Sequence, residues 1–194
     1  MREIIELKRK QFEVIEELGE HSKKVERNGK IYFLKEYPNK QSFELALDNF
    51  NKLHKNGVFV PDIYMYEKNK FVMVREFIEG ETVLDMLLKE DLSEEIIEKV
   101  FNVNWYVRNG KLSIDFKPEN FKLYKDKLCY LPLICGKYNE KYLFQNQDIW
   151  FWFYTKDFVN YIINKGIKVD QNRANVNQAA LNKNIALMVV KYYK

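Results

Sequence analysis

Alternating apolar and polar positions run through the first eighty residues and predict β-strands. We expect strands over residues 12–18, 22–27, 30–37, 63–67 and 71–77. Asn28-Gly29 separates the second strand from the third, and this dipeptide favours a two-residue hairpin turn. Residues 2–10 are densely charged and predict a short helix or a frayed lead-in. The chain is therefore expected to open with three antiparallel strands.

Apolar residues at helical spacing appear between and after these strands. Residues 39–55 show this spacing, and Gly57 follows as a stop signal. The run Asp91-Leu92-Ser93-Glu94 is a capping signal for a helix that extends to about residue 107. Further helices are expected over residues 81–88 and 174–193, and a hairpin over residues 121–124 and 127–133. The pattern predicts an α+β fold, with an antiparallel sheet first and helices after it.

Composition adds bounds on the class of protein. The 194 residues are enough for one domain or two small lobes, and 46% hydrophobic with 15% aromatic residues predicts a real core. The formal net charge of +4 is spread along the chain and is too weak to indicate nucleic acid or a membrane surface as a partner. Without a secretory leader, Cys129 and Cys135 indicate reduced, buried thiols in a cytoplasmic protein.

Residues 113–120, Ser-Ile-Asp-Phe-Lys-Pro-Glu-Asn, concentrate the candidate chemistry in one short loop. Asp115 is placed to accept a hydroxyl proton, Lys117 to neutralise charge on a moving phosphoryl group, and Asn120 to hold a metal ion. A strand predicted directly after the loop would hold it rigidly. The alternative is an ordinary polar turn after a helix.

The run Asp-x-Lys-Pro-Glu-Asn resembles the catalytic loop of protein kinases, whose usual form is H-R-D-x-K-P-E-N. Ser113 and Ile114 replace the histidine and arginine. The resemblance extends in order over roughly residues 12 to 165. It implies a reduced two-lobed protein-kinase-like fold of the α+β class. Residues 1–80 would form the N-lobe, and residues 81–194 a helical C-lobe with the catalytic-type loop at 111–121.

The resemblance also implies roles for single residues. Lys35 matches the lysine of the V-A-I-K motif that contacts nucleotide phosphates; alternatively, its stem lies on the sheet and its amine reaches water. Asp148, in a run that resembles the opening of a buried kinase helix, would brace the loop backbone, and Gly166 would end that helix. The implied catalytic residues are Asp115 and Lys117, the implied metal ligand is Asn120, and the implied nucleotide contacts are Lys35, Gly19, Val25, Glu76, Ile78 and Glu44.

Several positions depart from the kinase pattern. Residues 133–136, Leu-Ile-Cys-Gly, stand where kinases carry the metal-binding Asp-Phe-Gly, so the aspartate is missing. The glycine-rich phosphate loop is reduced to Gly19. Phe33 occupies the small-residue position that leaves room for adenine. Ala46 stands where the lysine-pairing glutamate belongs, so that Glu44 and Asp48 are the nearest carboxylates.

Two functions are compatible with this combination of matches to the kinase pattern and departures from it. The first is a weak or atypical ATP-dependent phosphotransferase of the protein serine/threonine kinase type, with ATP and Mg²⁺ as cofactors and a protein substrate. The second is a pseudokinase, a binding or regulatory module that contacts a partner protein without phosphoryl transfer. A third reading is an unrelated α+β domain with a coincidental loop. Phe33 filling the space beside residues 76–78 would favour the pseudokinase, and Lys35 facing Asp115 across a cleft would favour the enzyme.

Overall fold

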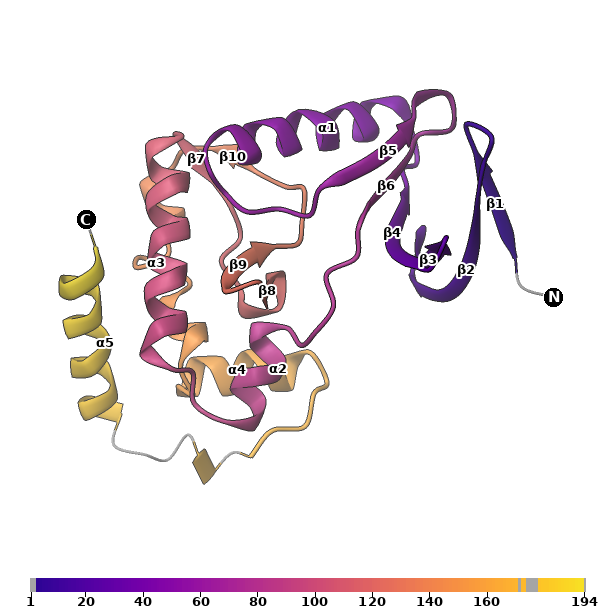
Figure 1. Ribbon diagram of the computed structural model, residues 1–194. Helices are drawn as coiled ribbons and strands as arrows, with labels where there is room; N and C mark the ends of the chain where they lie inside the picture. Colours follow the sequence, from indigo (N-terminus) through magenta and orange to yellow (C-terminus); the bar gives the residue numbers. More distant parts are fainter. Residues whose placement is uncertain (1–2, 171, 174–177, 194) are drawn as a thin grey trace.

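The structure is a computed structural model that describes residues 3–170, 172–173 and 178–193. It has an α+β fold in which an antiparallel sheet is followed by a mixed region of helices and short strands (Figure 1). The sheet contains six strands in the order β1-β2-β3-β4-β6-β5. They are β1 (Ile4–Leu7), β2 (Lys10–Gly19), β3 (Ser22–Arg27), β4 (Lys30–Glu36), β5 (Ile63–Glu67) and β6 (Val72–Glu76).

Strand β1 corrects the expectation of a helix or frayed lead-in over residues 2–10. It pairs antiparallel with β2, with Ile5 opposite Phe12. Lys8 and Arg9 form the turn between them, both with positive φ (46° and 64°). Leu7 and Phe12 are buried inside the sheet. The apolar residues of this segment therefore alternate as in a strand with one buried face, a pattern that its many charges obscured.

The other predicted strands are confirmed, with small shifts at their ends. Asn28 and Gly29 both have positive φ (53° and 73°), as the predicted two-residue hairpin turn requires. A short 3₁₀-helix, η1 (Lys68–Lys70), replaces the simple turn between β5 and β6. The opening of the chain therefore follows the sequence pattern, apart from the additional first strand.

The sheet curls into a half-barrel because its two edges approach each other. The backbone N–H of Lys8 donates to the Glu67 carboxylate at 3.0 Å, and the Lys70 amine donates to the Glu6 carbonyl oxygen at 2.8 Å. These contacts join the β1–β2 turn to the end of β5. The interior of the curl is filled by the buried side chains of Leu7, Phe12, Val25, Leu34, Val72 and Val74.

Helix α1 (Lys40–Lys55) connects β4 to β5 and packs on the rest of the molecule. It begins after Asn39, whose side chain accepts a hydrogen bond from the Ser42 backbone N–H, and Gly57 follows it with a φ of 83°, as predicted. Its buried face joins a core that continues into the helical region. The α1 residues in that core are Phe43, Ala46 and Leu53.

The region after the sheet contains several short elements around helix α3 (Glu94–Asn109). Ser93 caps α3 as predicted, and β9 ends three residues earlier than expected. A 3₁₀-helix and a later α-helix replace the single helix expected from Asp148 to Gly166. The elements besides α3 are α2 (Val83–Lys89), β7 (Leu112–Ser113), η2 (Pro118–Asn120), β8 (Phe121–Tyr124), β9 (Lys127–Tyr130), β10 (Gly136–Lys137), η3 (Glu140–Tyr142), η4 (Ile149–Trp152), α4 (Lys156–Asn164) and α5 (Gln178–Tyr192).

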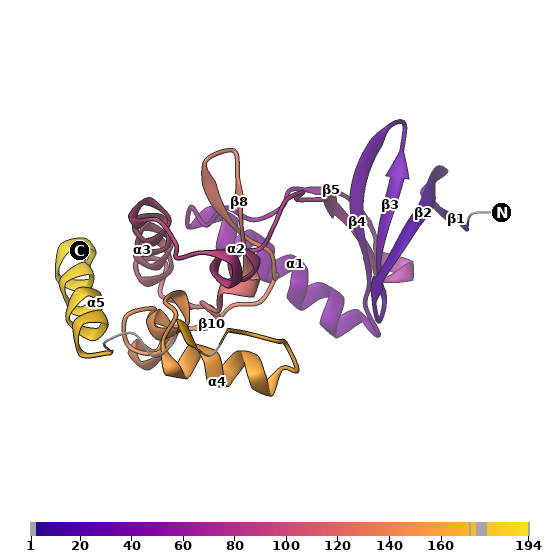
Figure 2. The ribbon, with the colours of Figure 1, turned by 90° about the horizontal axis from the view of Figure 1, so that it is seen from below.

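Helix α5 lies on the side of α3 that faces away from the sheet (Figures 1 and 2). Ile185 is buried there, and the Tyr192 ring contacts that of Phe101 at 5.8 Å. Ala180 of the same helix is exposed, and residues 174–177 of the predicted helix lie outside the described residues. Of the helices in the described part of the chain, none combines the length and apolar character needed to cross a membrane.

The two thiols are free. Cys129 is buried as predicted, and its burial raises its pKa to about 12. Cys135 is only half-buried, which corrects the expectation for that residue.

Candidate functional site

Residues 113–120 form a loop whose conformation is held from several sides. Strand β7, which leads into it, pairs with β10, and the Ser113 hydroxyl donates to the Lys137 carbonyl oxygen at 2.9 Å. Beneath the loop lies a cluster of buried aromatic rings from Phe116, Phe121, Phe144 and Trp152, with centroids 5.4–6.1 Å apart where neighbouring rings meet. The polar segment therefore stands on a rigid apolar base.

Asp148 braces the loop backbone, as the kinase resemblance implied. Its side chain accepts a hydrogen bond from the Phe116 N–H at 3.1 Å, and the Trp152 indole N–H donates to the Phe116 carbonyl oxygen at 2.6 Å. Asp148 is 4% exposed, and its second oxygen has no hydrogen-bond partner among the described residues. Burial raises the pKa of Asp148, and the Phe116 N–H opposes this shift.

The three residues assigned to chemistry lie together at the surface of this loop. The Lys117 amine stands 3.5 Å from the Asp115 carboxylate, whose side chain is 47% exposed. The Lys117 backbone N–H also donates to that carboxylate at 3.2 Å, and the Asn120 amide donates to the Asp115 carbonyl oxygen at 3.2 Å. The loop thus presents an oriented, solvent-accessible carboxylate beside a cation.

Glu119 ties the same loop to helix α4. Its carboxylate accepts hydrogen bonds from the Tyr161 hydroxyl and the Lys165 amine. Burial opposes ionisation of Glu119, but the two donors outweigh it, so its pKa lies below the ordinary value. Glu119 of the loop therefore has a structural role, because it connects the loop to helix α4.

Lys35, on β4, reaches the turn between β2 and β3. Its amine donates to the Glu20 carbonyl oxygen at 3.1 Å and to the Ser22 hydroxyl at 3.0 Å. Because Gly19 pairs with Ser22, only two residues form this turn, and it offers Lys35 a carbonyl oxygen where a phosphate loop would offer backbone N–H groups. Lys35 has no ion pair among the described residues.

Two further assignments to the nucleotide site disagree with the geometry. Glu44 pairs with Lys40 at 3.7 Å on its own helix, and Asp48 pairs likewise with Lys52, so neither carboxylate meets Lys35. Val25 is fully buried inside the half-barrel. Val25 lies opposite Tyr32, and cross-strand neighbours share a face of the sheet. Tyr32 and Lys35 are three residues apart on β4 and point to opposite faces, so Val25 points away from the Lys35 face.

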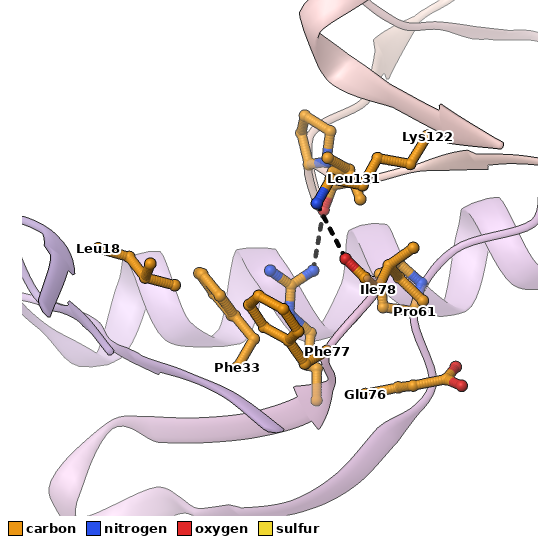
Figure 3. A pocket seen from close by; sticks show the side chains of 10 residues that line it. Leu18, Phe33, Pro61, Glu76, Phe77, Ile78, Lys122 and Leu131 are labelled. Carbon is orange, nitrogen blue, oxygen red and sulfur yellow. Dashed lines mark hydrogen bonds between the residues drawn. The ribbon is translucent and has the colours of Figure 1, made fainter. Parts of the chain in front are cut away.

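A cavity of about 380 Å³ lies between the sheet and the following region, beside residues 76–78. Figure 3 shows Phe33, Phe77 and Leu18 on one side of it and Lys122 and Leu131 on the other. Its lining is Leu18, Phe33, Pro61, Arg75, Glu76, Phe77, Ile78, Lys122, Leu131 and Pro132. Glu76 and Ile78 are thus the predicted contacts that line this cavity, whereas Gly19, Val25, Lys35 and Glu44 are absent from its lining.

Phe33 and Arg75 stand side by side at this cavity. They are cross-strand neighbours in β4 and β6, and the guanidinium lies over the Phe33 ring at 4.8 Å. Arg75 is only 8% exposed and donates to the Leu131 carbonyl oxygen at 3.0 Å. This stacked pair takes up space that a small residue at position 33 would leave open, and the cavity of about 380 Å³ remains beside it.

The segment after β9 includes residues 133–136, which stand where kinases carry a metal-binding aspartate. Polar side chains that contact its backbone hold this segment in place. Besides Arg75 at Leu131, the Asn49 amide donates to the Leu133 carbonyl oxygen at 3.0 Å, and the Tyr130 hydroxyl donates to the Ile134 carbonyl oxygen at 3.0 Å. No three His, Cys, Asp or Glu side chains in the described part of the chain come together to hold a metal ion. Asn120 shares its loop with one carboxylate, that of Asp115, and its own amide nitrogen donates to the Asp115 carbonyl oxygen at 3.2 Å.

Sequence reasoning missed Arg75, Lys122 and Asn49. A signal existed for two of them. Arg75 lies two residues after the apolar Met73 in a strand, so the two side chains share one face of the sheet. Asn49 lies three residues after Ala46 and four before Leu53, on the apolar face of α1. A polar residue in such a position predicts a buried hydrogen bond. Lys122 gave no such signal, since its burial depends on how β8 faces residues 77–78.

Comparison of the chain with protein-family models and with curated proteins gave no match.

Proposed function

We propose that this protein is a kinase-shaped binding and regulatory module, a pseudokinase with a reduced two-lobed fold, that does not transfer phosphate. The lobes would be residues 1–80 and 81–194. The order of elements, the loop at residues 113–120 and its brace by Asp148 support the kinase-like part of this proposal.

One observation carries the non-catalytic part. Phe33 and the Arg75 guanidinium stack at 4.8 Å beside residues 76–78, so a bulky ring and a buried cation line the cavity at the position where a kinase would seat adenine. Three further observations agree with it. Lys35 bonds the β2–β3 turn, Glu44 pairs with Lys40, and no three His, Cys, Asp or Glu side chains of the described residues come together to hold a metal ion. These observations support a module that does not use Mg²⁺-ATP.

A weak or atypical phosphotransferase is the second candidate, and one observation favours it. The Asp115 carboxylate is exposed and oriented by the Lys117 backbone and amine, which is the arrangement a general base for an alcohol requires. A module without chemistry has no evident need for that exposed pair. The acceptor would be a serine or threonine hydroxyl by family analogy.

Thermal unfolding with nucleotide separates the two candidates. We expect no rise in melting temperature at millimolar ATP with Mg²⁺, compared with ATP plus a chelator. A phosphotransferase would instead be stabilised by about 2.7 kcal/mol when ATP is present at about a hundred times its dissociation constant. That stabilisation would require Mg²⁺ and would be lost in Lys35→Ala.

The control is Lys30→Ala, which removes an exposed lysine from the same strand. A magnesium-dependent shift that survives Lys30→Ala but not Lys35→Ala would establish a nucleotide site at Lys35. ATP consumption by the wild type that is lost in Asp115→Asn would overturn the proposal, because it would demonstrate the chemistry.

A further inference from the structure

The guanidinium of Arg75 is a buried cation without a counter-charge. It has no ion pair among the described residues, and its Nε has no hydrogen-bond acceptor. One terminal nitrogen donates to the Leu131 carbonyl oxygen, drawn as a dashed line in Figure 3. A buried charge is costly unless it is paired, and a single neutral carbonyl does not pair it.

A second cation faces the same cavity. The Lys122 amine donates to the Ile78 carbonyl oxygen at 2.9 Å and lies 5.7 Å from the centre of the Phe77 ring. Burial lowers the pKa of Lys122, and this side chain also lacks an ion pair within the described residues. Lys24 adds positive charge at the rim, with its amine 4.8 Å from the centre of the Phe77 ring.

The acid in the cavity lining does not neutralise these cations. The Glu76 carboxylate accepts a hydrogen bond from the Tyr124 hydroxyl at 2.9 Å and lies 3.8 Å from the Lys125 amine. Figure 3 shows it directed away from Phe33, Phe77 and Lys122. Asp85 and Glu79 also act on the charge of Lys122, but neither forms an ion pair with it and neither lines the cavity. Arg75 and Lys122 are therefore the charged groups of the lining that have no ion pair among the described residues.

The size and lining of the cavity define what fits. Its volume of about 380 Å³ is near the lower end of the usual range for small-molecule sites. Phe33 and Phe77 offer ring surfaces, and Leu18 and Pro61 add apolar contacts. An uncharged ring would leave Arg75 unpaired, and a nucleoside triphosphate would need the phosphate loop and metal donors that the site lacks.

We propose that this cavity binds a small aromatic carboxylate, with its ring against Phe33 and Phe77 and its carboxylate between Arg75 and Lys122. This assignment rests on the proposed non-catalytic function, because it gives the former nucleotide position a different ligand. A carboxylate matches the guanidinium by charge-assisted hydrogen bonds. The same ligand would compete with the Leu131 carbonyl oxygen for the Arg75 guanidinium. Its binding would therefore loosen a contact that holds the segment after β9.

Calorimetric titration of the full chain tests the assignment with three probes. They are 2-naphthoate, its neutral analogue 2-naphthamide, and acetate, which has the charge without the ring. We expect 2-naphthoate to bind about tenfold or more tightly than 2-naphthamide, the difference that one charge-assisted hydrogen bond makes. Acetate at the same concentration should give no heat of binding. Equal affinities for the two ring compounds, or no binding of 2-naphthoate at millimolar concentration, would overturn the proposal.

Substitutions of the two cations test which of them binds the carboxylate of the ligand. Arg75→Met and Lys122→Met should each reduce the preference for 2-naphthoate over 2-naphthamide, with the larger loss in Arg75→Met. Lys127→Met is the matched control, because Lys127 is an exposed lysine of the same hairpin that lies outside the lining, and this variant should keep the wild-type preference. If Arg75→Met does not fold, the wild type and Lys122→Met decide the question. A wild-type preference that falls in Lys122→Met supports the assignment, and a preference that is absent in the wild type or unchanged in Lys122→Met contradicts it.

The outcome is separable from that of the proposed function. Absence of both 2-naphthoate and Mg²⁺-ATP binding would reject the aromatic carboxylate alone. ATP consumption that is lost in Asp115→Asn, together with displacement of 2-naphthoate by Mg²⁺-ATP, would reject the non-catalytic function while confirming that the cavity takes aromatic anions.

Discussion

The carboxylate of Asp148 accepts a hydrogen bond from the backbone N–H of Phe116 at 3.1 Å, although the two residues are 32 positions apart. Trp152, one 3₁₀ turn after Asp148, donates to the carbonyl oxygen of the same residue. Both backbone groups of Phe116 are thus satisfied by side chains, one from Asp148 just before η4 and one from Trp152 at its end. The position of Asp115 and Lys117 depends on this contact, because Phe116 lies between them.

Removal of the Asp148 acceptor should destabilise the fold. Asp148→Ala leaves the buried Phe116 N–H unsatisfied, which costs about 1–3 kcal/mol. Asp148→Asn keeps an oxygen acceptor of the same shape and should cost less. Urea unfolding of the two variants measures the difference. Equal losses of unfolding free energy in both would show that the hydrogen bond to Phe116 does not matter for stability.

The same carboxyl predicts a pH dependence. Burial raises the folded-state pKa of Asp148 above the unfolded value. The folded protein therefore holds this proton more tightly, so the contribution of Asp148 is most favourable below the unfolded pKa and is lost as the pH rises through the folded pKa. Relative to Asp148→Asn, the wild type should gain unfolding free energy as the pH falls through that window. A difference that stays constant with pH would contradict the raised pKa.

Glu119 should show the opposite trend. Its folded-state pKa is lowered because Lys165 and Tyr161 donate to it more strongly than burial opposes its ionisation. Its contribution is present above the unfolded pKa and is lost as the pH falls through the folded pKa. Unfolding free energies of the wild type and Glu119→Gln, measured across acid pH, should therefore converge as the pH falls. Divergence on acidification would count against the two donors.

Asn49 is the third buried polar contact whose removal we expect to be measurable. Its side chain, 4% exposed, donates to the carbonyl oxygen of Leu133 and connects α1 to the segment after β9. Asn49→Ala should cost about 1–3 kcal/mol by leaving that carbonyl without its donor. The exposed Asn51→Ala on the same helix is the control and should change the unfolding free energy by no more than about 0.5 kcal/mol. Similar losses at both positions would reject the role of Asn49.

Local patterns in the sequence were sufficient for the regular elements. The Asn28-Gly29 turn, the Asn39 and Ser93 caps and the alternation in β3 and β4 are properties of short segments, so they could be read without knowing the fold. Strand β1 was misjudged because its partner, β2, is what makes its alternation meaningful. The candidate loop was also recognisable, since Asp115 to Asn120 are contiguous.

The tertiary structure decided which groups meet across distance. Arg75 joins Phe33 and Leu131, Lys122 joins Ile78, and Asn49 joins Leu133 only because the sheet, α1 and the β8–β9 hairpin converge at one cavity. The sequence by itself determined the α+β character, most elements and the polar loop, because these follow from neighbours in the chain. Burial and charge pairing were decided by packing, because the environment of a side chain is set by residues distant in sequence.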